Sequence, residues 1–135
     1  MKKWIAPMAL ITLMAGTIAV TLSGNALAHG LKAKHGGIMR EVANLQFELV
    51  ASKDAASAGV AKIYVEDHGK IYSTAGASGK LTVLNGAEKT EVVLHASGEN
   101  VLESKDDAKL AAGAKVVALI TFADKKTVSV RFAVK

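Results

Sequence analysis

Apolar residues occupy every second position in several short segments of the chain, which is typical of β-strands with one buried face. The alternating positions are Leu45, Phe47 and Leu49; Ala61, Ile63 and Val65; Leu81 and Val83; Val92 and Leu94; and Val128, Val130, Phe132 and Val134. The segment from Val116 to Phe122 is apolar apart from Thr121, which predicts a strand that is buried on both sides. The pattern therefore predicts an all-β domain built from short strands.

Turn-forming residues separate the predicted strands. Asp67-His68-Gly69, Asn85-Gly86 and residues 123–126 each lie between two strand segments, and Asn-Gly supplies the positive φ angles that a tight hairpin needs. The alanines of residues 106–113 allow a short helical turn. Strand segments at about ten-residue spacing predict a single β-sandwich, with the immunoglobulin fold as the nearest comparison, or a small barrel of seven to eight strands.

The first 28 residues have the organisation of a secretory signal peptide. Lys2 and Lys3 precede an uncharged, mostly apolar run over residues 5–22, and Ala26-Leu27-Ala28 matches the small-x-small cleavage pattern. The alternative is an uncleaved anchor helix, because the apolar run approaches spanning length. We expect cleavage after Ala28, a β-domain over residues 29–135 with no membrane span after cleavage, and a location in the periplasm.

Charge and length narrow the possible functions of residues 29–135. Loss of two lysines with the signal peptide lowers the formal net charge from +5 to +3. The remaining basic residues are scattered and form no stripe with aromatic residues, so nucleic-acid binding has no support. A chain of 107 residues forms one domain and is long enough to bury a core without disulfides.

Cysteine is absent, and Met39 is the one methionine after residue 28. These facts exclude disulfides, thiolate metal sites, a cysteine nucleophile and a methionine-rich copper(I) site. The sequence also contains no nucleophile-elbow, phosphate-loop or dinucleotide-binding motif. We therefore expect a protein that is not an enzyme, although sequence does not exclude a metal-dependent hydrolase or oxidase on an open histidine site.

The histidines are the remaining candidates for chemistry, since imidazole binds zinc, copper(II), nickel and iron. Cleavage after Ala28 would make His29 the first residue, whose α-amine and ring Nδ1 can together chelate one ion. The alternative for His29 is a frayed chain end. His35 precedes Gly36-Gly37, which permits either a close approach of backbone or ligand, or a flexible lead-in to the first strand.

A third histidine, His68, lies in a predicted hairpin turn beside Asp67. Asp67 is either a second ligand or a carboxylate that orients the imidazole. Its alternative role is turn formation, for which Asp and Gly are favoured by backbone geometry. His95 shares the outward parity of Glu91 in its strand and is interpreted as a solvated surface residue. The candidate metal ligands are therefore His29, His35, His68 and Asp67.

Several segments resemble a family of small periplasmic proteins associated with heavy-metal efflux, and the metal-binding portion of periplasmic adaptor proteins of metal-exporting RND pumps. The similar segments are His35-Gly36-Gly37, residues 47–50, residues 64–70, residues 74–77 and residues 79–84. The resemblance covers most of residues 36–84 and thins out afterwards. It implies that His35 and His68 take part in metal binding and that the partner is an efflux pump or its adaptor.

Two main interpretations remain. The first is a periplasmic accessory protein for metal efflux or resistance, which binds a divalent ion (copper(II), zinc, nickel or cobalt) through histidines and exchanges it, because three nitrogen ligands leave an open position. Copper(II) or zinc is the expected cofactor. The second is a non-catalytic periplasmic interaction module that binds a partner by strand addition and has no specific metal site.

Overall fold

The computed structural model describes residues 32–52 and 59–135, and within them the chain forms strands and no helix. The strands are β1 (Ile38–Val42), β2 (Leu45–Ala51), β3 (Ala61–Asp67), β4 (Lys70–Ile71), β5 (Ser78–Asn85), β6 (Glu88–Ala96), β7 (Val101–Ser104), β8 (Lys115–Thr121) and β9 (Thr127–Ala133). Every pairing is antiparallel, in the order β1-β2-β3-β7-β6-β5-β8-β9, and β4 pairs with β3 beside this path.

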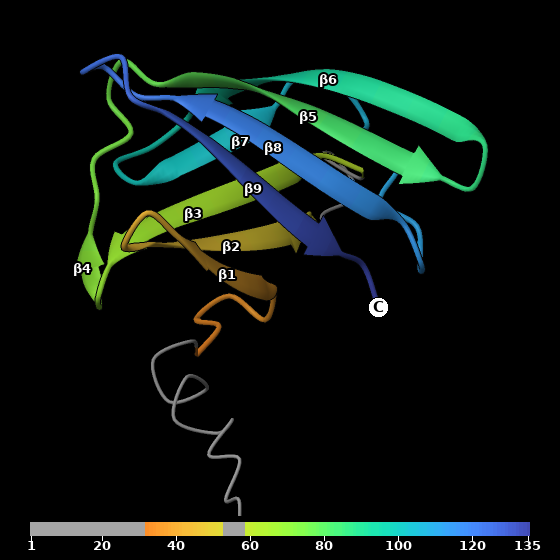
Figure 1. Ribbon diagram of the computed structural model, residues 1–135, viewed down its shortest axis with the longest axis horizontal. Helices are drawn as coiled ribbons and strands as arrows, with labels where there is room; N and C mark the ends of the chain where they lie inside the picture. Colours follow the sequence, from red (N-terminus) through yellow and green to blue (C-terminus); the bar gives the residue numbers. More distant parts are fainter. Residues whose placement is uncertain (1–31, 53–58) are drawn as a thin grey trace, which may run out of the picture.

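The single sheet rolls up until its two end strands lie next to each other (Figure 1). Neither end strand has a second ladder partner among the described residues, so β1 and β9 form a seam. One side-chain hydrogen bond spans the seam, in which Nε of Arg40 donates to the carbonyl oxygen of Arg131 over 2.9 Å. The prediction of an all-β domain is confirmed, and the rolled sheet corresponds to its small-barrel form.

The interior of the roll is the hydrophobic core. Alternate residues of each long strand point inward, as their spacing predicts. The fully buried side chains include Phe47, Ile63, Val65, Leu81, Val83, Leu94, Leu102, Val116, Ile120 and Val130. Hairpin turns follow where the sequence predicts them, at 67–69, 85–86 and 123–126. Core packing and strand pairing therefore stabilise the fold without the disulfides that cysteine would supply.

Three details differ from the sequence prediction. The described chain has nine strands, because β4 and β7 are too short to display a clear alternation. The apolar segment around β8 is not buried on both sides, since Leu119 is 47% exposed on its outer face. Residues 106–113 are irregular rather than helical. Among the described residues there is also no helix with the length and apolar character needed to cross a membrane.

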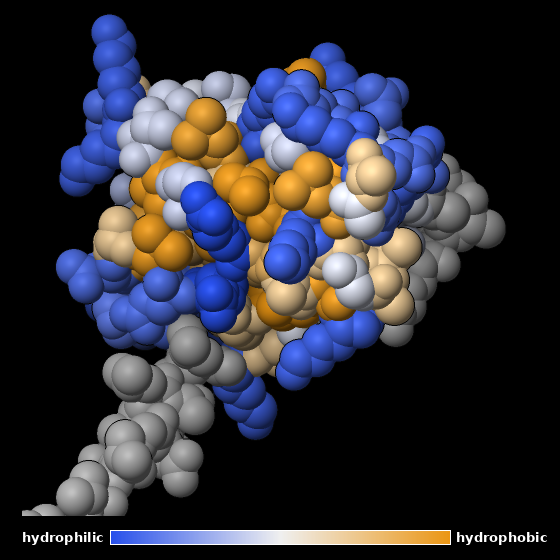
Figure 2. Space-filling view, turned by 45° about the vertical axis from the view of Figure 1, so that its right-hand side comes forward, coloured by the Kyte–Doolittle hydropathy of each residue, from blue (hydrophilic) through white to orange (hydrophobic). Residues whose placement is uncertain are grey.

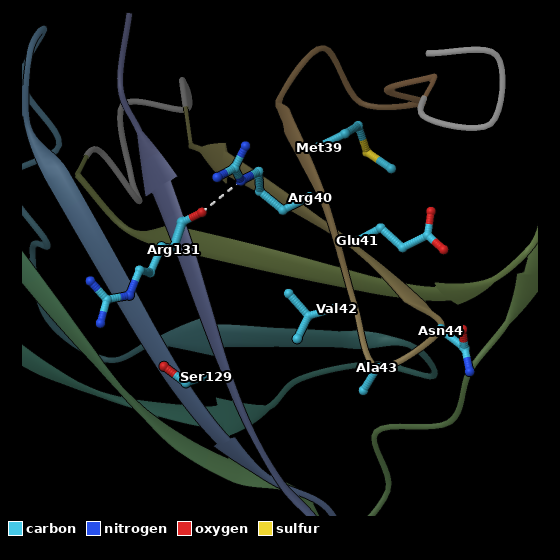
Figure 3. Close-up of a pocket in the computed structure, with 8 residues that line it drawn as sticks. All are labelled: Met39, Arg40, Glu41, Val42, Ala43, Asn44, Ser129 and Arg131. Carbon is cyan, nitrogen blue, oxygen red and sulfur yellow. Dashed lines mark hydrogen bonds between the residues drawn. The ribbon is translucent and has the colours of Figure 1, made fainter. Parts of the chain in front are cut away.

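The seam encloses a hollow of about 640 Å³. Its lining residues are Met39, Arg40, Glu41, Val42, Ala43, Asn44, Ser129 and Arg131. Figure 3 shows Arg40 and Val42 pointing from β1 toward β9, whereas Met39 and Glu41 point to the opposite side of the strand. The guanidinium of Arg131 points away from Arg40. The polar groups of the hollow therefore do not converge on one point, and we assign the hollow no ligand.

Candidate functional site

The candidate site lies on the outer face of β1, β2 and β3. On this face Met39, Glu48 and Tyr64 are cross-strand neighbours in one row, and Glu41, Gln46 and Glu66 are neighbours in the next. Successive rows on one face of a strand are about 7 Å apart. We call residues 32–37, which precede β1, the strap. The strap donates backbone and side-chain hydrogen bonds to this face, and Gln46 and Glu48 are buried even though they point away from the core.

Glu48 receives four hydrogen bonds from the strap. Its Oε1 accepts from the backbone N–H of Lys34 and from Nδ1 of His35, both at 3.1 Å. Its Oε2 accepts from the backbone N–H of His35 at 2.9 Å and from that of Gly37 at 2.8 Å. A carboxylate is buried at low cost only when its oxygens are hydrogen-bonded in this way. Glu48 therefore holds the strap in place.

The two glycines after His35 make this close approach possible. Gly36 has a φ of 70°, a left-handed conformation that glycine adopts without steric cost. A Cβ at Gly37 would collide with the backbone carbonyl oxygen of Leu49. Of the two interpretations that the sequence left open, close approach of backbone is thus the one that the structure shows.

The ring of His35 is fixed in position on two sides. It stacks on Tyr64, with ring centroids 3.7 Å apart and planes inclined by 7°. In the neutral ring, a hydrogen bond to Glu48 places the hydrogen on Nδ1, because a carboxylate accepts hydrogen bonds and donates none. Nε2 then carries the free lone pair. The side chain remains 38% exposed, so solvent reaches the ring.

His68 belongs to a second cluster, which we call the His68 cluster and which also contains Asp67 and Glu41. Nδ1 of His68 lies 2.8 Å from Oδ1 of Asp67, and Nε2 lies 3.8 Å from Oε1 of Glu41. The side chain of His68 is 61% exposed. The hydrogen bond that Asp67 accepts raises the pKa of His68 above its ordinary value of 6.5; the negative charges of Asp67 and Glu41 act in the same direction, and partial desolvation opposes them.

The strap and the His68 cluster meet at a small hollow of about 290 Å³. Lys32, Lys34, Gln46, Glu66, His68 and Gly69 line it. Nζ of Lys34 forms an ion pair with Oε1 of Glu66 over 3.0 Å along this hollow. His35 thus contacts Glu48 in one row of this face, and His68 lies near Glu41 in the next row.

The predicted ligands have different surroundings in the structure. His35 and His68 each have their own carboxylate, and Asp67 contacts the ring of His68. His29 lies outside the described residues. In residues 32–52 and 59–135, no group of three or more His, Cys, Asp or Glu side chains is arranged to hold one ion. Sequence reasoning missed Glu48 and Glu41, which occupy polar positions of strands and carry no local motif.

His95 also differs from its interpretation as a solvated residue. It lies on the outer face of β6, but it is only partly exposed, and its Nδ1 is buried with no hydrogen-bond partner. Its cross-strand neighbours are Ser78 and Glu103, and the structure shows no hydrogen bond or ion pair between them and the ring.

Compared with protein-family models, with curated proteins and with solved structures, the chain has no match.

Proposed function

We propose that the protein is a periplasmic accessory protein for metal efflux or resistance that binds and exchanges a divalent transition-metal ion. The observation that carries the proposal is shared by His35 and His68. In each, Nδ1 is held by a carboxylate, at 3.1 Å and 2.8 Å respectively. Histidines that bind metals are commonly oriented by a carboxylate in this way, which leaves Nε2 for the ion.

The donor set selects the class of metal. Imidazole nitrogens with carboxylate oxygens and no thiolate suit copper(II), zinc, nickel and cobalt. The ligands lie at the surface of a preformed barrel, so the fold does not depend on the ion. An ion bound by few protein ligands keeps exchangeable positions, which suits transfer to a partner better than permanent structural binding. The resemblance of residues 36–84 to efflux-associated proteins suggests a pump or its adaptor as that partner.

A calorimetric titration with copper(II) and zinc tests this proposal. The protein begins at His29, and it is compared with a version carrying one extra residue before His29 and with a His35→Ala/His68→Ala double variant. His95→Ala is the control, because it removes an imidazole outside the site. We expect one-to-one binding that the double variant loses and the control retains. Weaker binding by the extended version would make the terminal amine a further ligand.

The alternative, an interaction module without a metal site, is favoured by one observation. Val93 and Leu119 are 57% and 47% exposed and flank Lys80 in a single row across β6, β5 and β8. Apolar side chains are also exposed on the face of the molecule drawn in Figure 2, with hydrophilic ones among them. Binding that is weak and indifferent to every histidine change would reject the metal proposal and favour this one.

A further inference from the structure

Glu41 lies near Nε2 of His68, where a second ligand of an ion bound by His68 would be expected. It is on the outer face of β1, and His68 is in the turn after β3, two strands away in the sheet. The turn gives His68 a φ of 49° and Gly69 a φ of 88°. Two successive positive φ angles are the geometry of a tight hairpin turn, and histidine is among the residues that tolerate it. In this conformation the ring of His68 lies between the carboxylates of Asp67 and Glu41.

The two carboxylates lie near different nitrogens of the ring. Oδ1 of Asp67 is 2.8 Å from Nδ1, which is hydrogen-bonding distance. Glu41 lies on the opposite side of the ring. Nε2 is 3.8 Å from Oε1 of Glu41, which is too long for a hydrogen bond. A tetrahedral ion with bonds of about 2.1 Å to nitrogen and oxygen holds these two atoms about 3.4 Å apart. A small rotation of the exposed Glu41 side chain brings the pair to that spacing.

Space for the remaining ligands adjoins His68. The hollow of about 290 Å³ beside His68 has polar walls from Lys32, Lys34, Gln46 and Glu66. It has room for several water molecules. The described part of the chain contains no group of three or more His, Cys, Asp or Glu side chains that could hold an ion, so the protein would supply two ligands here. Water must complete the coordination shell.

The geometry points to a divalent-ion site between Nε2 of His68 and a carboxylate oxygen of Glu41, with Asp67 as the positioning residue. This inference rests on the proposed function and assigns its ion a place. It makes Glu41 a ligand and moves Asp67 from ligand to orienting group. It places the ion beside His68, where a second carboxylate faces Nε2; among the described residues, His35 contacts one carboxylate, Glu48, through Nδ1, and its ring packs on Tyr64. Nitrogen and oxygen donors fit zinc, copper(II), nickel or cobalt.

Zinc titrations of single variants test the site. The changes are Glu41→Gln, His68→Ala and His35→Ala, and the control is Glu88→Gln, another exposed glutamate, whose Oε1 lies 3.9 Å from Nζ of Lys109. We expect Glu41→Gln to weaken zinc binding by about tenfold or more, since even an orienting partner contributes that much. His68→Ala should weaken it similarly, and Glu88→Gln should leave it unchanged. In ¹⁵N-histidine spectra, zinc should shift Nε2 of His68. Unchanged amide spectra away from the turn would show that Glu41→Gln remains folded.

The outcomes separate the inference from the proposed function. Wild-type zinc affinity in Glu41→Gln, or an unshifted Nε2 of His68, overturns the site proposed here. If His35→Ala alone abolishes binding, the protein binds metal elsewhere, so the proposed function survives and this inference fails. If no histidine change alters binding, both fail.

Discussion

Glu48 shows how one side chain can organise a segment that has no regular secondary structure. The strap forms no ladder, and its backbone N–H groups at Lys34, His35 and Gly37 would otherwise depend on water. The carboxylate satisfies all three and also binds the ring of His35. The position of His35 therefore depends on a residue 13 positions later in the chain.

Replacement of Glu48 by alanine should destabilise the domain. Three backbone donors and one imidazole lose their acceptor, so we expect the free energy of unfolding to fall by about 2–4 kcal/mol. Urea denaturation of the variant and the wild type measures this difference. Glu103→Ala is the matched control on β7, where the glutamate is partly exposed and its side chain forms no hydrogen bond with the described residues; a change of more than about 0.5 kcal/mol is not expected there. Equal effects of the two substitutions would contradict the role given to Glu48.

The titration of His68 should depend on Asp67. Because Asp67 raises the pKa of His68 above 6.5, Asp67→Asn should lower it toward that value. A pKa raised by folding contributes stability that is complete below the unfolded-state pKa and is lost as the pH rises through the folded-state pKa. NMR titration of the His68 ring in both proteins measures the shift. A pKa that does not fall in Asp67→Asn would contradict the observed hydrogen bond.

The site was only partly predictable at this scale. Histidine chemistry pointed to His35 and His68, and Gly36-Gly37 indicated a close approach without saying to what. Glu48 and Glu41 occupy outward positions of alternating strands, where glutamate normally faces solvent. Nothing local distinguishes them, because their partners are brought in by strand pairing and by the strap. Whether the predicted histidines bind metal stays a prediction.

At the scale of single elements, β8 shows the limit of reading burial from composition. Every residue from Val116 to Ile120 is apolar, yet the strand has one inward face and one outward face. A rolled sheet without covering helices leaves the outer face in water, so Val117 and Leu119 stay at the surface. The alternation that identified the other strands is not visible here, because the outward residues are apolar as well.

A pair of neighbouring substitutions in β8 tests this asymmetry. Ile120 is fully buried, so Ile120→Ala should lower the free energy of unfolding by about 2–5 kcal/mol through lost burial and the cavity left behind. Leu119 is 47% exposed, and Leu119→Ala should cost less than about 1 kcal/mol. Denaturant titrations of the two variants give the comparison, and similar losses would mean that the outer face of β8 is covered.

At the scale of the whole molecule, the seam should be the least stable part of the sheet. Strands within the path have two neighbours, whereas β1 and β9 have one ladder each and meet through Arg40. Arg40→Ala removes that contact. We expect faster amide hydrogen exchange in β1 and β9 and unchanged exchange in β5 and β6, because local openings are independent of the stable core. Lys115→Ala on the outer end of β8 is a control for lost surface charge. Uniform acceleration across all strands would contradict a local seam.

The sequence was sufficient to predict the class of fold but not its closure. Alternation, turn residues and the absence of cysteine identified an all-β domain that packs without disulfides. The choice between a sandwich and a barrel depends on which strands pair, and these pairings join segments far apart in the chain. For example, β3 pairs with β7, which makes Ile63 a cross-strand neighbour of Leu102. No local pattern carries that information.

The seam joins the first strand that is synthesised to the last, so the order of synthesis differs from the order in which strands meet in the barrel. The hydrogen bond from Arg40 to Arg131 joins residues 91 positions apart, so β1 is synthesised long before β9, and the barrel can close only once β9 is present. Each of the eight strands in the path runs opposite to its neighbour, so β1 and β9 are antiparallel and the start of β1 lies beside the end of β9 (Figure 1). A linker between those ends, with new termini opened at Asn85-Gly86, would preserve every ladder. Closure of the barrel is thus a property of the strand pairings and not of where the chain starts.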